Sequence, residues 1–235
     1  MTVPQIMAYL EANGSESIKK ILLKHGIREP FFGVKIEHLK VIQKQVKKDY
    51  QLAKDLYATG NADAMYLAGL IADDDQMSKA DLQDWVNRAV SQNIIDYTVP
   101  WVATGSKYGY ELALEWIDSA DVNIATAGWS TLANWVSLHP DSELDMVSLR
   151  KLLQRVVEQI HTVSDRVRST MNSFMISLGT YVAQLNTEVI EAAKKIGVVI
   201  VDKGGTACKT PDAIEYINKA MSKGALGKKK KMVKC

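Results

Sequence analysis

Apolar side chains recur along this chain with the spacing of an α-helix, from its first residues to its last third. The i, i+3, i+4 pattern is found in Ile6, Met7 and Leu10, in Ile18, Ile21 and Leu22, in Leu39, Ile42 and Val46, and in Leu67, Leu70 and Ile71. Sustained alternation is nearly absent, and only a short β-branched run at residues 198–201 has the character of an extended segment. The pattern therefore predicts an all-α protein.

Polar and glycine-containing breaks separate these helical runs. They are Asn13-Gly14, Thr59-Gly60, Asp73-Asp74-Asp75, Thr104-Gly105, His139-Pro140 and Gly204-Gly205. About twelve helices result, and neighbours pair into hairpins of roughly 40 residues, the unit length of HEAT and armadillo repeats. We expect a HEAT-like solenoid of about five to six antiparallel pairs rather than a bundle of more even helices. A single repeat domain over residues 1–226 would precede a basic tail, residues 227–235.

The charge is distributed unevenly. The 235 residues have a net charge of only +2, but residues 1–54 carry +5, residues 55–149 carry −12 and residues 150–235 carry +9. Apolar residues form 47% of the chain, which disfavours disorder, and charges interrupt them too often for the roughly 18-residue apolar stretch of a membrane span. Basic ends suggest an acidic partner such as nucleic acid, whereas the acidic middle opposes one.

Cysteine and histidine usage indicates neither disulfide stabilisation nor a metal centre. The two cysteines, Cys208 and Cys235, lack the spacing of a zinc site, and the first residues lack the features of a signal peptide. We expect a reduced, cytoplasmic protein without a cofactor or metal.

The predicted helix over residues 164–182 carries candidates for nucleic-acid binding. Its core arc holds Val167, Met171, Phe174, Leu178 and Tyr181, and its flanks hold Arg166, Arg168, Asn172 and Ser173. Arginines near a helix start often form a solvated face, but the guanidinium fork also binds phosphate oxygens. Arg166, Arg168 and Asn172 are therefore candidate DNA contacts.

Further candidates lie in the tail and in one loop. The tail contains Lys228, Lys229, Lys230 and Lys231, followed by Lys234. Such a run is typical of a mobile solubilising segment or of non-specific phosphate binding. All five tryptophans lie in the middle of the chain, where core positions are their usual place. Trp101, which follows Pro100 and precedes the loop that carries Lys107, is the one we expect at the surface.

Asp96 is the candidate for chemistry. It lies in the apolar sequence Asn93-Ile94-Ile95-Asp96-Tyr97. A carboxylate in such a setting caps a helix or pairs with a base, or else it is partly buried and stabilises a developing cation.

A family resemblance connects these features. It is carried by Pro30-Phe31-Phe32-Gly33-Val34-Lys35, Leu39, residues 42–44, residues 52–60 and Leu67-Ala68. These residues resemble the opening of the AlkD-type DNA alkylation-repair proteins, which are HEAT-like repeat proteins. Active members are DNA glycosylases that remove N3- and N7-alkylated purines. The resemblance is specific over residues 30–100 and weaker to about residue 200.

The resemblance also implies site residues, most of which this chain lacks. Active members carry a Trp-x-x-x-Asp pair, a phosphate-binding arginine and a second tryptophan. Here Asp96 matches the carboxylate, but Gln92, Thr126 and Ser173 occupy the other three positions. A cationic lesion loses the aromatic faces that would hold it through cation–π contacts, each worth about 0.5–2 kcal/mol.

Three functional interpretations follow. The first is a DNA alkylation-repair-like protein that binds DNA as a monomer, with doubtful glycosylase activity. The second is an active N-glycosylase in which Asp96 is the catalytic carboxylate and Trp101 replaces a missing aromatic. The third is a scaffold for a protein partner, in which the acidic middle attracts a basic surface.

Overall fold

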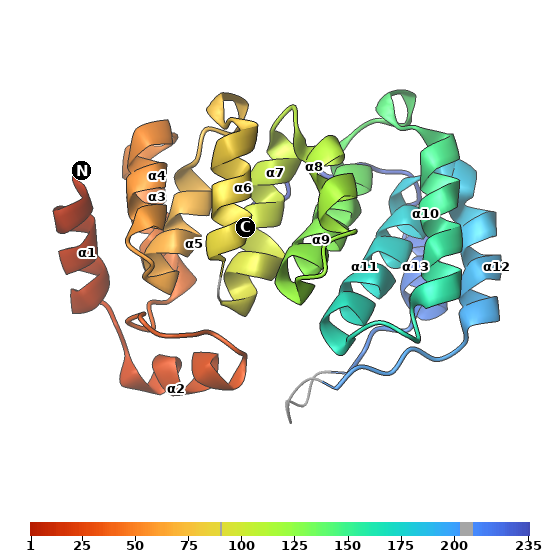
Figure 1. The fold of residues 1–235 in the computed structure, drawn as a ribbon, viewed down its shortest axis with the longest axis horizontal. Coiled ribbons are helices and arrows are strands. Elements are labelled where there is room, and N and C mark those ends of the chain that lie inside the picture. Colours follow the sequence, from red (N-terminus) through yellow and green to blue (C-terminus); the bar gives the residue numbers. More distant parts are fainter. Residues whose placement is uncertain (90, 203–208) are drawn as a thin grey trace. The chain divides into compact units, whose positions relative to one another are not determined.

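The computed structural model describes residues 1–89, 91–202 and 209–235, and it is helical along most of that length (Figure 1). No strand occurs among the described residues, which confirms the predicted all-α class. The β-branched run at residues 198–201 is an irregular segment. The predicted break at Gly204-Gly205 and the residue Cys208 lie outside the described part of the chain.

The chain divides into two compact units, and the predicted boundary at residue 226 does not coincide with this division. Unit 1 contains residues 1–112 and residues 234–235, and unit 2 contains residues 113–233. The helix α8 (Gly109–Trp116) spans the point where the chain leaves unit 1. No described helix is both long enough and apolar enough to cross a lipid bilayer.

Unit 1 is built from short helices that pack as neighbours. They are α1 (Val3–Ala12), α2 (Glu16–Lys24), α3 (Ile36–Val46), α4 (Tyr50–Ala58), α5 (Ala62–Ile71), α6 (Lys79–Arg88) and α7 (Val99–Gly105), with a 3₁₀ turn at Asp74–Gln76 and a π-turn at Ile94–Thr98. The helix pair α4 and α5 forms the most extensive contact in this unit. Every residue of α5 is buried, which places this helix at the centre of the unit 1 core.

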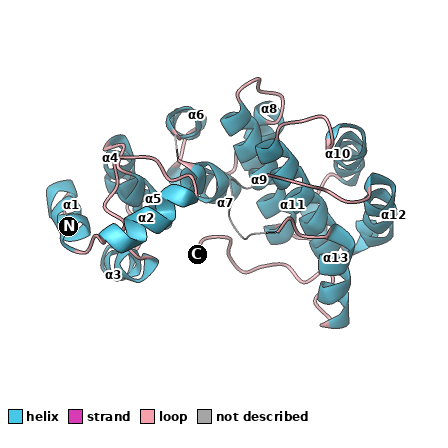
Figure 2. Ribbon diagram, turned by 90° about the horizontal axis from the view of Figure 1, so that it is seen from below, coloured by secondary structure: helices cyan, strands magenta, loops and turns pink. Residues whose placement is uncertain are grey.

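Unit 2 has longer helices in two layers. They are α9 (Val122–Leu138), α10 (Met146–Gln159), α11 (Asp165–Tyr181), α12 (Asn186–Ile196) and α13 (Ala213–Ser222), with 3₁₀ turns at Asp141–Glu143 and Ala183–Leu185. Figure 2 shows α9, α11 and α13 side by side in one layer and α10 and α12 in the other. The packing of α9 against α11 forms the main contact of this unit.

Helix boundaries follow the local signals in the sequence. Helices end at Ala12, Ala58, Ile71, Gly105 and Leu138, each at a predicted break. The acidic residues Asp121 and Asp145 begin α9 and α10, where a carboxylate oxygen accepts hydrogen bonds from free N–H groups of the first turn. Part of the acidic middle of the chain therefore consists of helix caps.

Aromatic side chains fill the core of each unit. In unit 1 the rings of Tyr57 and Trp85 stack with centroids 4.0 Å apart, and the Tyr57 hydroxyl donates to the carbonyl of Trp85. In unit 2 Trp129 packs against Phe174 at 5.4 Å. Trp85, Trp116 and Trp129 are buried, as expected for tryptophans in core positions, and Trp101 is buried as well.

Candidate nucleic-acid interface

Asp96 lies on the π-turn that precedes α7. The N–H of Val99 donates to the carbonyl of Ile94, five residues earlier, which widens the helix at this point. Pro100 favours this widening, because it has no N–H to donate to the carbonyl of Asp96, four residues before it. Turns of this type are frequent at functional sites.

Close packing from α5 holds the π-turn. Ile94, Ile95 and Thr98 are buried beneath it, and Asp96 is partly exposed. Gly69 of α5 makes the approach possible, since a Cβ at this position would lie 2.5 Å from the Thr98 methyl carbon. The backbone that carries Asp96 is therefore fixed by the core of unit 1.

An aromatic row begins directly after Asp96. Tyr97 is 53% exposed, and its ring centroid lies 5.8 Å from that of Trp101. The ring of Trp101 in turn meets Tyr66 edge to face, with centroids 5.3 Å apart. The exposed member of the row is therefore Tyr97, which sequence reasoning missed. The sequence feature that could have indicated Tyr97 is its position directly after Asp96.

The expectation that Trp101 reaches the surface is wrong. The side chain is only 6% exposed, because Tyr97 and Tyr66 both pack against its ring. The proline before it continues the helix instead of turning the chain outward, since Pro100 occupies one of the first positions of α7. A direct contact between Trp101 and DNA would require this aromatic row to open.

Gln92 contributes to the packing of unit 1. Its backbone N–H donates to the carbonyl of Gly26 at 3.3 Å, and its side chain lies over the same glycine. A Cβ at Gly26 would collide with the Gln92 side chain. Gln92 is thus engaged by the segment after α2.

In unit 2, Thr126 and Ser173 satisfy their hydroxyl groups within their own helices. Thr126 is buried, and its hydroxyl donates to the carbonyl of Val122 at 2.6 Å. Ser173 is exposed, and its hydroxyl donates to the carbonyl of Ser169 at 3.0 Å. Neither side chain offers a positive charge or an aromatic face.

The three candidates on α11 lie in different environments. Arg166 is partly exposed. The guanidinium of Arg168 donates, over 2.7–3.3 Å, to the Asp165 carboxylate and to the carbonyls of Ile160, His161, Val163 and Ile200. Arg168 therefore ties the start of α11 to its surroundings, and binding a phosphate would require these hydrogen bonds to break.

Asn172 is 1% exposed and faces the segment that leads into α13. Its amide nitrogen donates to the carbonyl of Pro211 at 2.9 Å, and its side-chain oxygen is buried without a partner among the described residues. It lines a cavity of about 290 Å³ together with Met175, Lys194 and residues near Pro211. The structure therefore places Asn172 inside unit 2.

The lysine candidates also differ. Lys107, Lys228 and Lys231 are exposed. Lys229 donates to the carbonyl of Val136 and pairs with Asp141, both at 2.8 Å. The ammonium of Lys230 lies over the ring of Tyr181, 5.4 Å from its centroid. The structure thus differs from the predicted mobile tail, because side chains of unit 2 hold two of its lysines.

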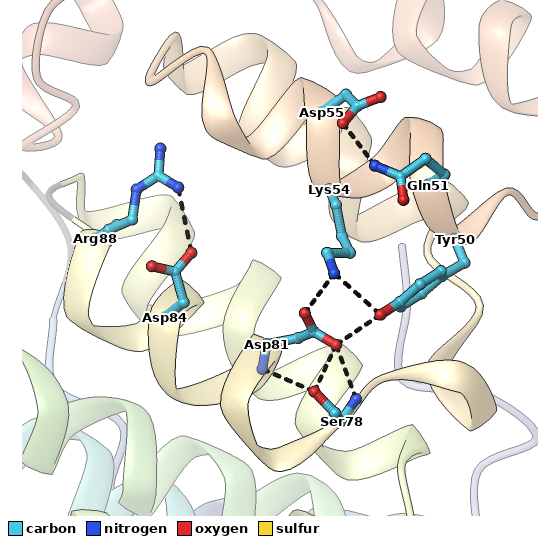
Figure 3. Close-up of polar contacts among 8 residues, drawn as sticks. All are labelled: Tyr50, Gln51, Lys54, Asp55, Ser78, Asp81, Asp84 and Arg88. Atoms are coloured by element: carbon cyan, nitrogen blue, oxygen red, sulfur yellow. Dashed lines mark hydrogen bonds and ion pairs between the residues drawn. The ribbon is translucent and has the colours of Figure 1, made fainter.

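A network of charged contacts joins α4 to α6 (Figure 3). The Asp81 carboxylate accepts hydrogen bonds from the hydroxyls of Tyr50 and Ser78 and from the backbone of Ser78, and it pairs with Lys54 at 2.7 Å. Burial opposes ionisation of Asp81, but the hydrogen bonds from Lys54, Ser78 and Tyr50 outweigh it and hold the pKa of Asp81 well below its usual value. A carboxylate so fully engaged stabilises the fold and is poorly suited to proton transfer.

A comparison with known protein families identifies the family of this chain. A family model described as "DNA alkylation repair enzyme" matches residues 6–217. The chain belongs to the DNA alkylation repair enzyme family. The resemblance seen in the sequence is thereby confirmed.

Proteins from two Listeria species are similar to this member of the DNA alkylation repair enzyme family. Lin0241 of Listeria innocua and Lmo0209 of Listeria monocytogenes are each 32% identical to it over 229 residues, which cover 95% of this chain and 99% of the relative. A solved structure, described as "a new family of proteins related to the HEAT-like repeat DNA glycosylases with affinity for branched DNA structures", is 35% identical. It covers all of both chains with a TM-score of 0.92, which confirms the HEAT-like fold class.

The segment that carries the resemblance to the alkylation repair family has a clear structural role. The backbone N–H groups of Phe32, Gly33 and Val34 all donate to the buried carboxylate of Asp63, at 2.6–3.3 Å. Burial raises the pKa of Asp63, and these three hydrogen bonds oppose that rise only in part. The motif therefore anchors the loop before α3 to the start of α5.

At least five of the fifteen acidic residues in the middle segment of this family member pair with basic residues from the two ends of the chain. Within unit 1 the pairs are Lys48–Asp73, Lys54–Asp81 and Lys234–Asp74, and within unit 2 they are Arg155–Asp118 and Lys229–Asp141. Part of the negative charge of the middle segment is therefore neutralised in local ion pairs with the basic ends. This pairing reduces the repulsion that the middle segment would exert on DNA.

Proposed function

We propose that this protein binds DNA at branched structures and does not act primarily as an N-glycosylase. The observation that carries the proposal is the relative of known structure, which matches the whole chain and is described as having affinity for branched DNA. Identity of 35% over the full length supports a shared mode of recognition. DNA is therefore the proposed partner.

The side chains at the positions of the family's catalytic residues support the same proposal. Gln92 is engaged by Gly26, Thr126 is buried and Ser173 bonds within its helix. None of the three can contact a cationic base with an aromatic face or hold a phosphate with a guanidinium. Asp96 alone would stabilise an oxocarbenium-like sugar, without the groups that position the lesion.

Exposed cations provide the proposed electrostatic contacts. Lys107, Lys228 and Lys231 are exposed, and Arg166 is partly so. Each cation that neutralises a phosphate releases counterions, so binding should weaken as salt increases. The present contacts of the other candidates would have to rearrange before these side chains could bind DNA. They are Arg168, Asn172, Trp101, Lys229 and Lys230.

Binding to a four-way junction, compared with a duplex of the same length at several salt concentrations, tests the proposal. We expect the junction to bind more tightly than the duplex and both affinities to fall with salt. Equal affinity for the two forms would contradict the preference for branched DNA. Failure to bind either form at low salt would instead favour the protein scaffold.

The second candidate function is excision of alkylated purines with Asp96 as the catalytic carboxylate. It is favoured by one observation, the partly exposed position of Asp96 on a π-turn beside the exposed ring of Tyr97. Incubation with duplex DNA that contains 7-methylguanine measures it directly. Base release that disappears in Asp96→Asn would establish the enzyme, and we expect no release above the spontaneous rate.

The oligomeric state and the location of the protein remain predictions. We propose a monomer, which sedimentation velocity in the absence and presence of junction DNA would test. A cytoplasmic location rests on the cysteine usage of the sequence. Fractionation of cells that produce the full chain would test it.

A further inference from the structure

Tyr97 is an unusual surface feature of unit 1. Among the described aromatic residues, only Tyr97 and Tyr216 belong to the strongly exposed apolar side chains, with 53% and 49% exposed. Tyr97 also lies between the partly exposed Asp96 and the fully buried Thr98. A large ring exposed directly beside buried residues offers a stacking surface that solvent already reaches.

The ring of Tyr97 is held in place before any ligand arrives. Trp101 lies four residues later, and the two ring planes are inclined by 35° at a centroid distance of 5.8 Å. Trp101 is itself fixed by the edge-to-face contact with Tyr66. A ring supported in this way loses little conformational entropy when a ligand stacks on it.

The backbone beneath Tyr97 is equally constrained. The π-turn is closed by the hydrogen bond from Val99 to Ile94, and Gly69 allows α5 to pack directly against Thr98. The buried side chains of Ile94, Ile95 and Thr98 anchor the turn and keep the ring of Tyr97 on its outer side. Its exposure is therefore a consequence of the local helix geometry.

The neighbouring carboxylate restricts what can stack there. Asp96 directly precedes Tyr97 and is partly exposed, so its negative charge disfavours a phosphate group at this position. A planar, uncharged ring is therefore the ligand that the exposed face of Tyr97 favours. Nucleobases are such rings, and they become accessible where DNA strands exchange and a base is left unpaired.

We propose that Tyr97 is a stacking platform for an unpaired nucleobase at a DNA branch point, an inference that rests on the proposed binding of branched DNA. Tyr97 then selects branched over fully paired DNA, while exposed lysines contribute affinity for any DNA.

The experiment uses the full chain and a three-way junction with two unpaired adenines at the branch, one replaced by 2-aminopurine. Anisotropy gives the affinity, and the fluorescence of 2-aminopurine reports stacking. The variants are Tyr97→Ala, Tyr97→Phe, which keeps the ring, and Tyr216→Ala, a matched exposed tyrosine in unit 2. Thermal unfolding of each variant shows whether it is folded.

We expect Tyr97→Ala to bind the junction about 10-fold more weakly and to lose the fluorescence change, because stacking on an aromatic side chain contributes about this much per base. Tyr97→Phe and Tyr216→Ala should behave as the unsubstituted protein does, and duplex affinity should not change. Junction binding and fluorescence unaffected by Tyr97→Ala would overturn the platform but leave DNA binding intact. An equal loss on junction and duplex would overturn it as well, and failure of the unsubstituted protein to bind the junction would reject the proposed function itself.

Discussion

The ammonium of Lys234 lies 2.6 Å from Oδ1 of Asp74, although 160 residues separate them in the sequence. Only 12% of the Lys234 side chain and 15% of the Asp74 side chain are exposed, and Lys234 also donates to the carbonyl of Ala72. Burial raises the pKa of Asp74 to about 6 even though Lys234 opposes the rise. Burial likewise lowers the pKa of Lys234, against the effect of Asp74.

This pair predicts a pH-dependent difference between the protein and its Asp74→Asn variant. A carboxyl group whose pKa is raised on folding stabilises the fold fully below about pH 4 and loses that contribution as pH rises through about 6. Relative to Asp74→Asn, the free energy of unfolding should fall by about 2 kcal/mol between pH 4 and pH 7. Urea denaturation of the protein and of Asp74→Asn at pH 4 and pH 7 measures this change. A stability difference between the two proteins that does not vary with pH would contradict the raised pKa of Asp74.

The network around Asp81 predicts a loss of stability in the opposite pH range. Asp81→Asn should lower the free energy of unfolding by about 1–3 kcal/mol at neutral pH, because hydrogen bonds to a charged group are lost. Since the pKa of Asp81 is lowered, its contribution is present above about pH 4 and lost as pH falls further.

Asp55→Asn is the control for this network, since Asp55 is exposed and accepts a hydrogen bond from Gln51 on the same helix (Figure 3). It should change stability by less than about 0.5 kcal/mol. Thermal or urea unfolding measures both variants. Similar losses of stability in the two would show that the network around Asp81 contributes no more to stability than the exposed Asp55 contact does.

Two glycines with the same backbone conformation predict different effects on substitution. Gly33 has φ +78° and Gly60 has φ +71°, so alanine is strained at both by about 1–2 kcal/mol. A Cβ at Gly33 would also lie 2.7 Å from the carbonyl oxygen of Ser15, whereas one at Gly60 would meet nothing within 4 Å. Gly33→Ala should therefore destabilise the protein by about 1–3 kcal/mol more than Gly60→Ala, as measured by urea unfolding. Equal losses would mean that the contact with Ser15 relaxes freely.

The tail lysines predict a separation of stability from DNA binding. Lys228→Ala and Lys231→Ala remove exposed charges, so each should reduce the slope of log K against log salt by up to about one while leaving thermal stability unchanged. Lys229→Ala removes the pair with Asp141 and the hydrogen bond to Val136, so it should lower the unfolding temperature. A lower salt slope in Lys229→Ala with no change in unfolding temperature would place this lysine on DNA instead.

The helical architecture could be read from local features of the chain. Apolar spacing indicated the helices, and breaks such as Thr59-Gly60 indicated where they end. Caps such as Asp121 and Asp145 depend on residues only two or three positions away. The family resemblance at residues 30–35 was likewise visible, although the carboxylate that binds this segment, Asp63, lies about thirty residues further on.

The candidate site was only partly predictable. Asp96 was identified, but the aromatic residue available beside it is Tyr97, because Trp101 is covered by Tyr97 and Tyr66. Helical periodicity places a side chain on a face of its own helix and does not show which neighbours cover that face. The π-turn also changes the faces on which the following side chains lie, because its wider turn interrupts the α-helical period at the position where the candidate site begins.

The sequence by itself determined the helical class, most helix ends and the family. Only the tertiary structure decided which charges are available, since Lys234 meets Asp74, Lys229 meets Asp141 and Arg168 is engaged by backbone carbonyls. The physical reason is the separation along the sequence between the groups that interact. Helix formation depends on interactions within a few residues, whereas burial and ion pairing depend on groups brought together by packing from distant parts of the chain.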